Sequence, residues 1–221
     1  METVRVYKFY SQKWALEALK ESRLKISQLN DLNDPFEFLP FNIQDQRYRN
    51  SLRNWRKNFF DDKGIICFSS RWSNPVLWSH YADSHKGAAL GFDIDASLLK
   101  TVDYTSKRLA ISDYIHNFEV FDEDIVWKLL LTKFTHWRYE TEKRLFVGLD
   151  ETEEKSGLYF KQFDDQLKLR EIVLGAHYVP IGDEILNKRL QEERIKIVTS
   201  RLAFGSFKIV SQRKKQFSKK P

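Results

Sequence analysis

Two glutamates and an arginine at alternate positions are the residues of this chain best suited to chemistry. Glu140, Glu142 and Arg144 lie in the stretch 137–145, WRYETEKRL. Alternate residues of an extended strand point to the same face, so we expect these three side chains to share one side. They could form a structural ladder of ion pairs, which on an exposed face contributes only about 0–1 kcal/mol per pair. In the alternative interpretation, Arg144 holds a catalytic glutamate in position.

A loop dense in turn-forming residues supplies a second group of candidates. The stretch 33–37 reads NDPFE. Asn and Asp bond to their own backbone in turns, and Pro fixes φ, so one interpretation is a rigid structural loop. The other is that the loop presents Asn33, Asp34 and Glu37 to a substrate at a cleft, where the carboxylates would bind a cation or an amine.

A third candidate stretch, 78–87, reads WSHYADSHKG and combines aromatic rings with imidazoles. Trp78 and Tyr81 could fill the core while His80 makes a fixed hydrogen bond. Alternatively, His80 and Tyr81 face a ligand, because aromatic rings and a neutral imidazole suit a planar base. The spacing His80-x-x-Asp83-x-His85 is not a standard zinc signature, and we predict no metal site.

Composition and familiar motifs exclude several classes of protein. The 221 residues include 32 aromatic ones, enough to build a core, and only 8 Gly and 5 Pro. The one cysteine, Cys67, can form neither an internal disulfide nor a cysteine-based zinc cage. No Gly-rich phosphate loop, GxSxG elbow, HExxH motif or dinucleotide fingerprint is present. No apolar stretch reaches the ~20 residues of a bilayer span, and METVRVYKFY lacks a signal-peptide core, so we expect a cytoplasmic protein.

The positive charge of the chain is concentrated at its C-terminal end. Of the net charge of +6, five positive charges lie in 213–221, on Arg213, Lys214, Lys215, Lys219 and Lys220, which leaves +1 for the rest. We therefore expect a domain over 1–212 and a basic tail over 213–221. The tail could bind nucleic acid through counterion release, or it could be a solvated terminus.

Hydrophobic patterning predicts the elements that must position these candidates. Apolar alternation or short apolar runs predict strands, and apolar spacing of three to four predicts helices. The predicted strands are 4–9, 24–28, 65–69, 88–93, 100–105, 142–149, 169–174, 194–199 and 204–210. The predicted helices are 12–20, 43–60, 75–82, 124–137 and 183–191. Strands and helices do not alternate strictly, so we expect one α+β domain with a curved, largely antiparallel sheet flanked by helices.

An ordered set of short motifs resembles a bacterial family, domain-of-unknown-function family 2971. The resemblance covers about residues 7–175, in the family's order. It is carried by YKF at 7–9, LNDPFE at 32–37, CFS at 67–69, WSHYAD at 78–83, HKG at 85–87, GFD at 91–93, WxYExExRL at 137–145 and IVLG at 172–175. The family has no settled activity, so this resemblance implies none.

The layout is also similar to that of compact ADP-ribosyltransferase-like domains, which use NAD as co-substrate. In those domains a polar residue on the first strand grips the nucleotide, a role that Lys8 or Tyr10 would fill here. A middle strand ends in Ser or presents an aromatic residue, which implies Ser69 with Tyr81. Those transferases usually carry Arg or His on the first strand, where this chain has Tyr10.

The same resemblance implies how the remaining candidates would act on NAD. The late strand of those domains carries a catalytic glutamate within Glu-x-Glu, which matches Glu140 and Glu142. That carboxylate would stabilise an oxocarbenium-like centre as nicotinamide leaves. Lys86 or Arg144 would bind the pyrophosphate.

Three hypotheses of function follow from the sequence. The first is an ADP-ribosyltransferase-like domain in bacterial defence, such as phage defence, or in a toxin system, with Lys8, Ser69, Tyr81 and Glu142 converging on one cleft. The second is a protein that binds or cleaves nucleic acid through its basic tail. The third is a non-catalytic interaction module.

Overall fold

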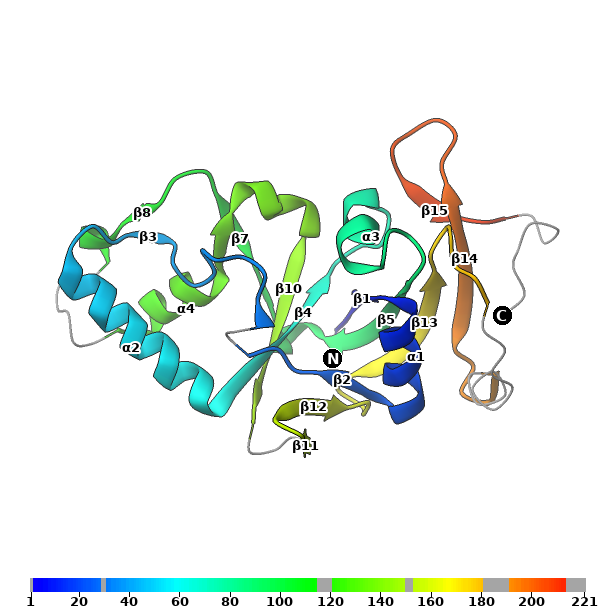
Figure 1. Cartoon of the computed structure of the whole chain (residues 1–221), viewed down its shortest axis with the longest axis horizontal. Coiled ribbons are helices and arrows are strands. Elements are labelled where there is room, and N and C mark those ends of the chain that lie inside the picture. The colour runs from blue at the N-terminus through cyan, green and yellow to red at the C-terminus, as the bar shows by residue number, and fades with distance from the viewer. Residues whose placement is uncertain (1, 29–30, 115–120, 150–152, 181–190, 214–221) are drawn as a thin grey trace.

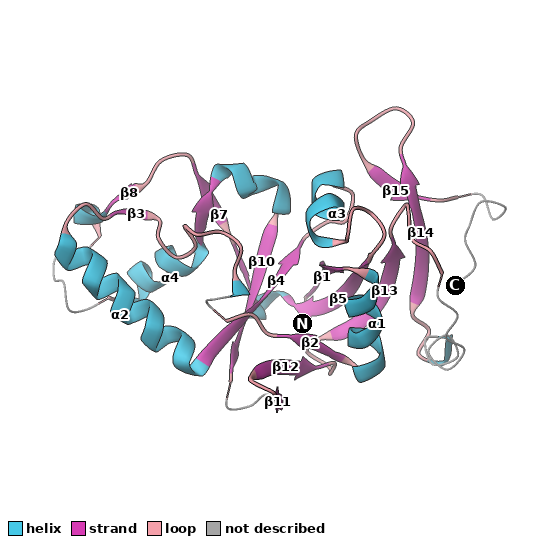
Figure 2. Ribbon diagram, viewed as in Figure 1, coloured by secondary structure: helices cyan, strands magenta, loops and turns pink. Residues whose placement is uncertain are grey.

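The structure is a computed structural model that describes residues 2–28, 31–114, 121–149, 153–180 and 191–213. Its centre is a curved sheet of eight strands (Figures 1 and 2). Their order is β15 (Ile209–Ser211), β14 (Lys196–Leu202), β13 (Lys168–Leu174), β5 (Ala88–Asp95), β1 (Thr3–Tyr10), β4 (Lys63–Ser69), β10 (Glu142–Gly148) and β6 (Leu99–Thr101). Every neighbouring pair is antiparallel except β13 with β14. The predicted α+β class with a curved, largely antiparallel sheet is confirmed.

Two helices cover opposite faces of the central strands. On one face, α1 (Gln12–Glu21) packs Ala15, Ala18 and Leu19 against Val6 and the strands beside it. On the other, α3 (Pro75–Tyr81) packs Leu77 and Trp78 against alternate residues of β1. Because both faces are covered, β5 is apolar along most of its length rather than alternating.

A second group of elements lies at one end of the molecule, on the left in Figure 1, beyond β10. It contains α2 (Gln46–Asp62), α4 (Glu123–Leu131) and a short parallel pair, β3 (Phe41–Asn42) with β8 (Leu109–Ala110). Asp45 and Asp122 cap the two helices, each accepting a hydrogen bond from the first turn. The helix α2 runs directly into β4 and therefore fixes one end of that strand.

Smaller elements complete the described chain. A three-stranded sheet joins β11 (Glu153–Lys155), β12 (Leu158–Gln162) and β2 (Arg23–Lys25), and a parallel pair joins β7 (Asp103–Thr105) to β9 (Thr132–Phe134). The 3₁₀ helices are η2 (Ala96–Leu98), η3 (Ile111–Asp113) and η4 (Thr135–Glu140).

The structure corrects three of the predicted elements. The helix predicted over 124–137 ends at Leu131, and β9 and η4 follow it, because 132–134 pair with β7. The strand predicted over 100–105 is two strands in different sheets. The strand predicted over 204–210 begins only at Ile209. The helix predicted over 183–191 falls almost wholly on 181–190, outside the described residues.

None of the helices in the described ranges is both long and apolar enough to cross a membrane.

Candidate functional site

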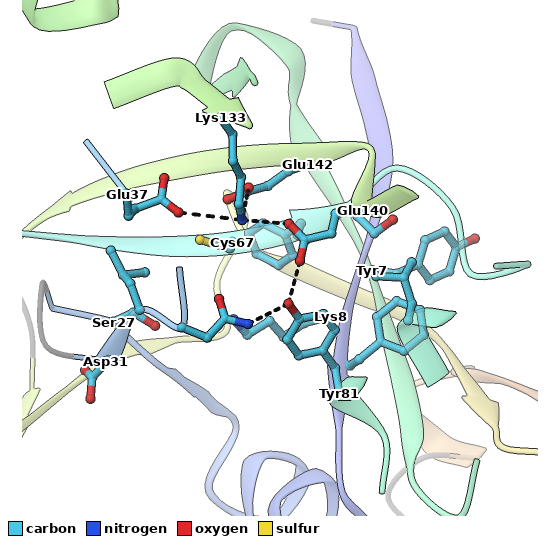
Figure 3. Close-up of a pocket in the computed structure, with 16 residues that line it drawn as sticks. Tyr7, Lys8, Ser27, Asp31, Glu37, Cys67, Tyr81, Lys133, Glu140 and Glu142 are labelled. Atoms are coloured by element: carbon cyan, nitrogen blue, oxygen red, sulfur yellow. Dashed lines mark hydrogen bonds and ion pairs between the residues drawn. The ribbon is translucent and has the colours of Figure 1, made fainter. Parts of the chain in front are cut away.

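A cavity of about 250 Å³ opens where β1, β4 and β10 meet the loop after β2 (Figure 3). Residues from six segments line it, and they are far apart in sequence. They are Tyr7, Lys8, Phe9, Ser27, Asp31, Leu32, Asn33, Glu37, Cys67, Phe68, Ser69, Leu77, Tyr81, Lys133, Glu140 and Glu142. The four residues expected to converge, Lys8, Ser69, Tyr81 and Glu142, all line it.

The two glutamates enter the cavity from a turn rather than from one strand. Glu140 ends η4, Thr141 adopts a left-handed conformation with φ of 45°, and Glu142 begins β10 opposite Ser69. The expectation that Glu140, Glu142 and Arg144 alternate along a strand is therefore wrong for Glu140. The backbone N–H of Glu142 donates to the Tyr104 hydroxyl at 2.9 Å, which holds the turn in place.

A buried lysine joins the carboxylates. The Lys133 ammonium, on β9, lies 2.7 Å from Glu140 Oε2, 3.2 Å from Glu142 Oε2 and 3.6 Å from Glu37 Oε2. Figure 3 shows these three carboxylates converging on the Lys133 nitrogen from different segments. Lys133 therefore fixes the positions of both candidate catalytic glutamates relative to the 33–37 loop.

Arg144 holds two of the same carboxylates, those of Glu37 and Glu142, from a buried position outside the cavity lining. Its Nε is 2.8 Å from Glu142 Oε1, and its Nη2 donates to Glu37 Oε1 at 2.5 Å. A third donor, Nη1, bonds the Leu130 carbonyl at 2.5 Å. Arg144 is 1 % exposed and does not line the cavity. From this position Arg144 orients the carboxylates. The resemblance implies that it binds a pyrophosphate, but the side chain does not reach the cavity in which that group would lie.

These five residues form what we call the ionic cluster: Glu37, Lys133, Glu140, Glu142 and Arg144. All five are buried, with 1–7 % of their surface exposed. Three carboxylates face two cations, so the cluster carries one excess negative charge when all are ionised. Charges buried this deeply are costly unless paired and hydrogen-bonded. The pairing is met within the cluster, and the half-buried Arg56 also interacts electrostatically with Glu37 from outside it.

A chain of hydrogen bonds continues from the cluster to the loop. The Tyr81 hydroxyl donates to Glu140 Oε1 at 2.5 Å, and Asn33 Nδ2 donates to that hydroxyl oxygen at 2.8 Å. Both hydrogen-bond donors to Glu140, Tyr81 and Lys133, suit a carboxylate anion. The ring of Tyr81 is thereby fixed at the wall of the cavity.

The surroundings shift the pKa values of the two glutamates in opposite directions. Burial raises the pKa of Glu140, and Lys133 offsets only part of that effect. Burial would also raise the pKa of Glu142, but Arg144 and Lys133 outweigh it and lower that pKa. Burial and the Glu142 charge raise the pKa of the Cys67 thiol, so this cavity-lining cysteine is held as a neutral thiol. Glu142 is therefore the more firmly ionised carboxylate of the pair.

Lys8 is the cation of the cavity wall outside the ionic cluster. It is partly exposed and forms no ion pair with any residue that the structure describes. Ser69, in contrast, is occupied, because its hydroxyl donates to the Arg71 carbonyl at 2.9 Å and lies 3.1 Å from the Thr141 hydroxyl. Lys8 is thus free to meet an anion, while Ser69 braces the turn that carries Glu142.

The structure places four other candidates outside the cavity lining. His80 and Lys86 are exposed. Asp34 is buried, and its Oδ1 accepts from the Phe36 backbone N–H, as expected for a rigid turn. Tyr10 packs with α1 and lines a different cavity. Asp34 and His80 therefore lie outside the cavity lining that Glu142 joins.

Sequence reasoning missed Lys133 and Tyr104 as site residues. Lys133 lay inside the helix predicted over 124–137, where nothing distinguished it from a solvated lysine. Tyr104 lay on a predicted strand, far in sequence from the three stretches singled out for chemistry. Lys133 lies between two acidic stretches, Glu123-Asp124 and Glu140 to Glu142. Its positive charge there is the one signal that could have suggested a partner for the glutamates.

Among the residues that the structure describes, no group of three or more His, Cys, Asp and Glu side chains is arranged to hold a metal ion. No protein-family model, curated protein or solved structure matches the chain. The resemblances to family 2971 and to ADP-ribosyltransferase-like domains stay predictions.

Proposed function

We propose that the cavity binds NAD and cleaves its nicotinamide–ribose bond, transferring the ADP-ribose to an acceptor or to water. The observation that carries this proposal is that three buried glutamates line a cavity whose wall also presents aromatic rings. The nicotinamide ring of NAD is a cation, and an anionic, ring-lined hollow complements it. When the bond breaks, positive charge moves to the ribose, where a fixed carboxylate stabilises it.

Glu142 is the carboxylate best placed for that role. Arg144 and Lys133 keep it ionised and fix its orientation, so little reorganisation is needed as charge develops on the ribose. Glu140, tied to Tyr81, adds to the negative potential beside it. In this proposal Lys133 and Arg144 position the carboxylates and do not contact the substrate.

Lys8 would bind the phosphate end of the same substrate. The carboxylates in the cavity would attract the cationic nicotinamide ring. Lys8, which has no ion-pair partner among the described residues, would attract the negatively charged phosphates that follow it in the substrate. A cavity of about 250 Å³ is small for a whole dinucleotide, since sites for drug-sized ligands span roughly 300–1,000 Å³. The nicotinamide and its ribose would lie inside, and the phosphates would leave past Lys8.

The direct test is incubation of the chain with labelled NAD, alone and with a bacterial lysate. We expect nicotinamide release or label transfer, and a rise in melting temperature with NAD. Glu142→Gln should lower the rate by about 10²–10³-fold, as removal of one electrostatic stabiliser does. No release, no transfer and no thermal shift in the wild-type chain would reject the proposal.

A matched variant controls for damage to the fold. Asp93 is also partly buried and ion-paired, with Arg5 Nε at 2.6 Å and Arg170 Nε at 3.4 Å, and none of these three residues lines the cavity. Asp93→Asn should retain activity while it remains folded. Equal loss of activity in both variants would mean that the effect is structural.

Replacing Lys8 tests the phosphate contact without touching the cluster. Lys8→Met should weaken NAD binding by about tenfold, the equivalent of one charge-assisted hydrogen bond, with an unchanged melting temperature. Lys57→Met, on an exposed position of α2, is the control. Unchanged NAD affinity in Lys8→Met would remove Lys8 from the site.

The ionic pairing also supports a second candidate function, the non-catalytic interaction module. Every carboxylate of the cluster is paired, and together they fasten β10 and β9 to the 33–37 loop. In that case Glu142→Gln would lower stability, and the wild-type chain would show no effect of NAD.

A further inference from the structure

The loop between β14 and β15 holds large apolar side chains out in solvent. It projects beyond the rest of the sheet, at the top of Figure 1. Phe204 is 94 % exposed, Phe207 is 98 % exposed and Leu202, at the base of the loop, is 56 % exposed. Single exposed apolar residues are ordinary, but three on one projecting loop indicate a surface that another molecule covers.

Backbone hydrogen bonds hold this loop, whose residues 202–207 we call the apolar tip. The Ala203 N–H donates to the Lys208 carbonyl at 2.9 Å, and the Ile209 N–H donates to the Ser73 carbonyl at 2.8 Å. Ile209 is fully buried in the same apolar cluster as α3, which fastens the base of the loop to the domain. A Cβ on Gly205 would meet no atom within 4 Å. The fold therefore holds the tip in place while leaving both phenylalanines in solvent.

The charge around the apolar tip has one sign. Arg201 and Lys208 flank it directly, and the Arg201 guanidinium lies 4.5 Å from the centroid of the Phe204 ring. From residue 194 to residue 221 the sequence has nine Lys and Arg and no Asp or Glu. Residues 1–193 hold the other 28 cationic and all 31 acidic side chains, a net charge of −3. An anionic partner therefore complements this part of the chain.

We propose that the apolar tip docks on an anionic lipid bilayer, with Phe204 and Phe207 entering the boundary between headgroups and acyl chains. The order of the residues matches the order of the layers. Apolar side chains lead, and the cations on either side of them meet the lipid phosphates. Such peripheral docking needs no spanning segment, and it does not depend on the chemistry proposed for the candidate site.

Two other occupants fit these observations less well. A second copy of the chain that met this one tip to tip would bring surfaces of the same positive sign together, which is unfavourable. Single-stranded nucleic acid is anionic, but its bases stack on rings that follow one another along a groove. Here both rings stand on one projecting loop, a shape suited to entering a soft layer.

Flotation of the whole chain with phospholipid vesicles tests the proposal. One set of vesicles is phosphatidylcholine, which is neutral overall, and the other also contains phosphatidylglycerol, which is anionic. The chain should float with the anionic vesicles and bind the neutral ones at least about tenfold more weakly, because several cations lie near the anionic surface. No flotation, or equal flotation with both sets, overturns the proposal.

The other two occupants have their own readouts. A single-stranded oligonucleotide that binds where the vesicles do not identifies nucleic acid as the occupant and overturns the proposal. A dimer in analytical ultracentrifugation that Phe204→Ala dissociates identifies a second copy and overturns it as well.

Two variants test the apolar contact. Phe204→Ala and Phe207→Ala should each weaken binding to the anionic vesicles by about tenfold, with an unchanged melting temperature, because both side chains are exposed in the free chain. Trp14→Ala is the control, since Trp14 is 51 % exposed on α1, across the sheet from α3, and should not alter binding. Vesicle binding that neither phenylalanine change weakens overturns the proposal.

A charge variant tests the contact with the headgroups. Lys208→Gln should weaken binding to the anionic vesicles by about fivefold. Lys57→Gln, on an exposed position of α2 at the other end of the molecule in Figure 1, should leave it unchanged. Equal losses in the two variants would mean that overall charge rather than the tip attracts the chain, and would overturn the proposal.

Discussion

Lys133 and Arg144 between them form ion pairs with three glutamates beside one cavity. Arg144 bonds Glu142 and Glu37 from the protein side, and Lys133 bonds Glu140 and Glu142 from the cavity side. Apolar residues of similar size would often be as stable as such a cluster. Binding of a cationic ring, as we propose, would give the cluster a role that stability alone does not.

The opposite pKa shifts of the two glutamates predict how stability depends on pH. The lowered pKa of Glu142 means that its contribution is complete above the ordinary glutamate value of about 4.3 and is lost as pH falls through the folded value. The raised pKa of Glu140 acts in the opposite sense, because its contribution is lost as pH rises.

Urea unfolding as a function of pH measures both effects. Glu142→Gln should flatten the loss of unfolding free energy on the acid side of about pH 4.3. Glu140→Gln should instead act above about pH 4.3, where it removes the decline in unfolding free energy that the wild-type chain shows as pH rises toward the raised pKa of Glu140. Identical slopes in the two variants would contradict the assignment of the shifts.

Two glycines allow the loop after α3 to pack closely against the backbone of neighbouring strands. A Cβ on Gly87 would lie 1.9 Å from the Tyr10 carbonyl oxygen, and one on Gly175 would lie 2.1 Å from that of His85. Both contacts are with backbone, which cannot turn aside as a flexible side chain can. The ends of β1, β5 and β13 therefore meet at a fixed separation beside α3.

Adding one methyl group at Gly87 tests this close approach. Gly87→Ala should destabilise the chain by about 1–3 kcal/mol or more, lowering the melting temperature by ~2–4 °C per kcal/mol. Gly205→Ala is the control, because a Cβ there meets nothing within 4 Å. Equal melting temperatures would mean that the strand ends separate freely.

At the level of elements, the sequence predicted best where hydrophobic patterning and local caps agreed. The helix predicted over 75–82 does begin at Pro75, and the structure adds Asn74 as its cap. The stretch 132–140 was predicted wrongly because its apolar spacing continues that of α4. Pairing of Thr132 with Asp103 decides its structure, and a contact so distant in sequence leaves no periodic signal.

The whole molecule explains why the site was only partly predictable. The types of Glu140, Glu142 and Tyr81 marked them as candidates, and the cavity does collect them. His80 and Lys86 come from the same stretch as Tyr81 but are exposed. Local sequence gives the chemistry of a side chain, whereas the packing of α3 on the sheet decides which of them face the cavity.

The basic end of the chain carries a prediction of its own. If 213–221 binds nucleic acid, the affinity for a single-stranded oligonucleotide should fall steeply with salt, with a log–log slope of about −0.7 per phosphate contacted. A chain ending at 212 should lose that binding, as fluorescence anisotropy would show. Binding that is insensitive to salt, or no binding, would contradict it.

The cavity between β1, β4 and β10 draws its lining from positions as distant as Tyr7 and Glu142. No fragment of the chain contains a working portion of it, because its wall exists only once the early and late strands have joined. Occupancy by a small molecule would consequently report on completed folding. Any ligand held there would also bridge segments as far apart as Tyr7 and Glu142, and it would oppose global unfolding by an amount that rises with the logarithm of its concentration.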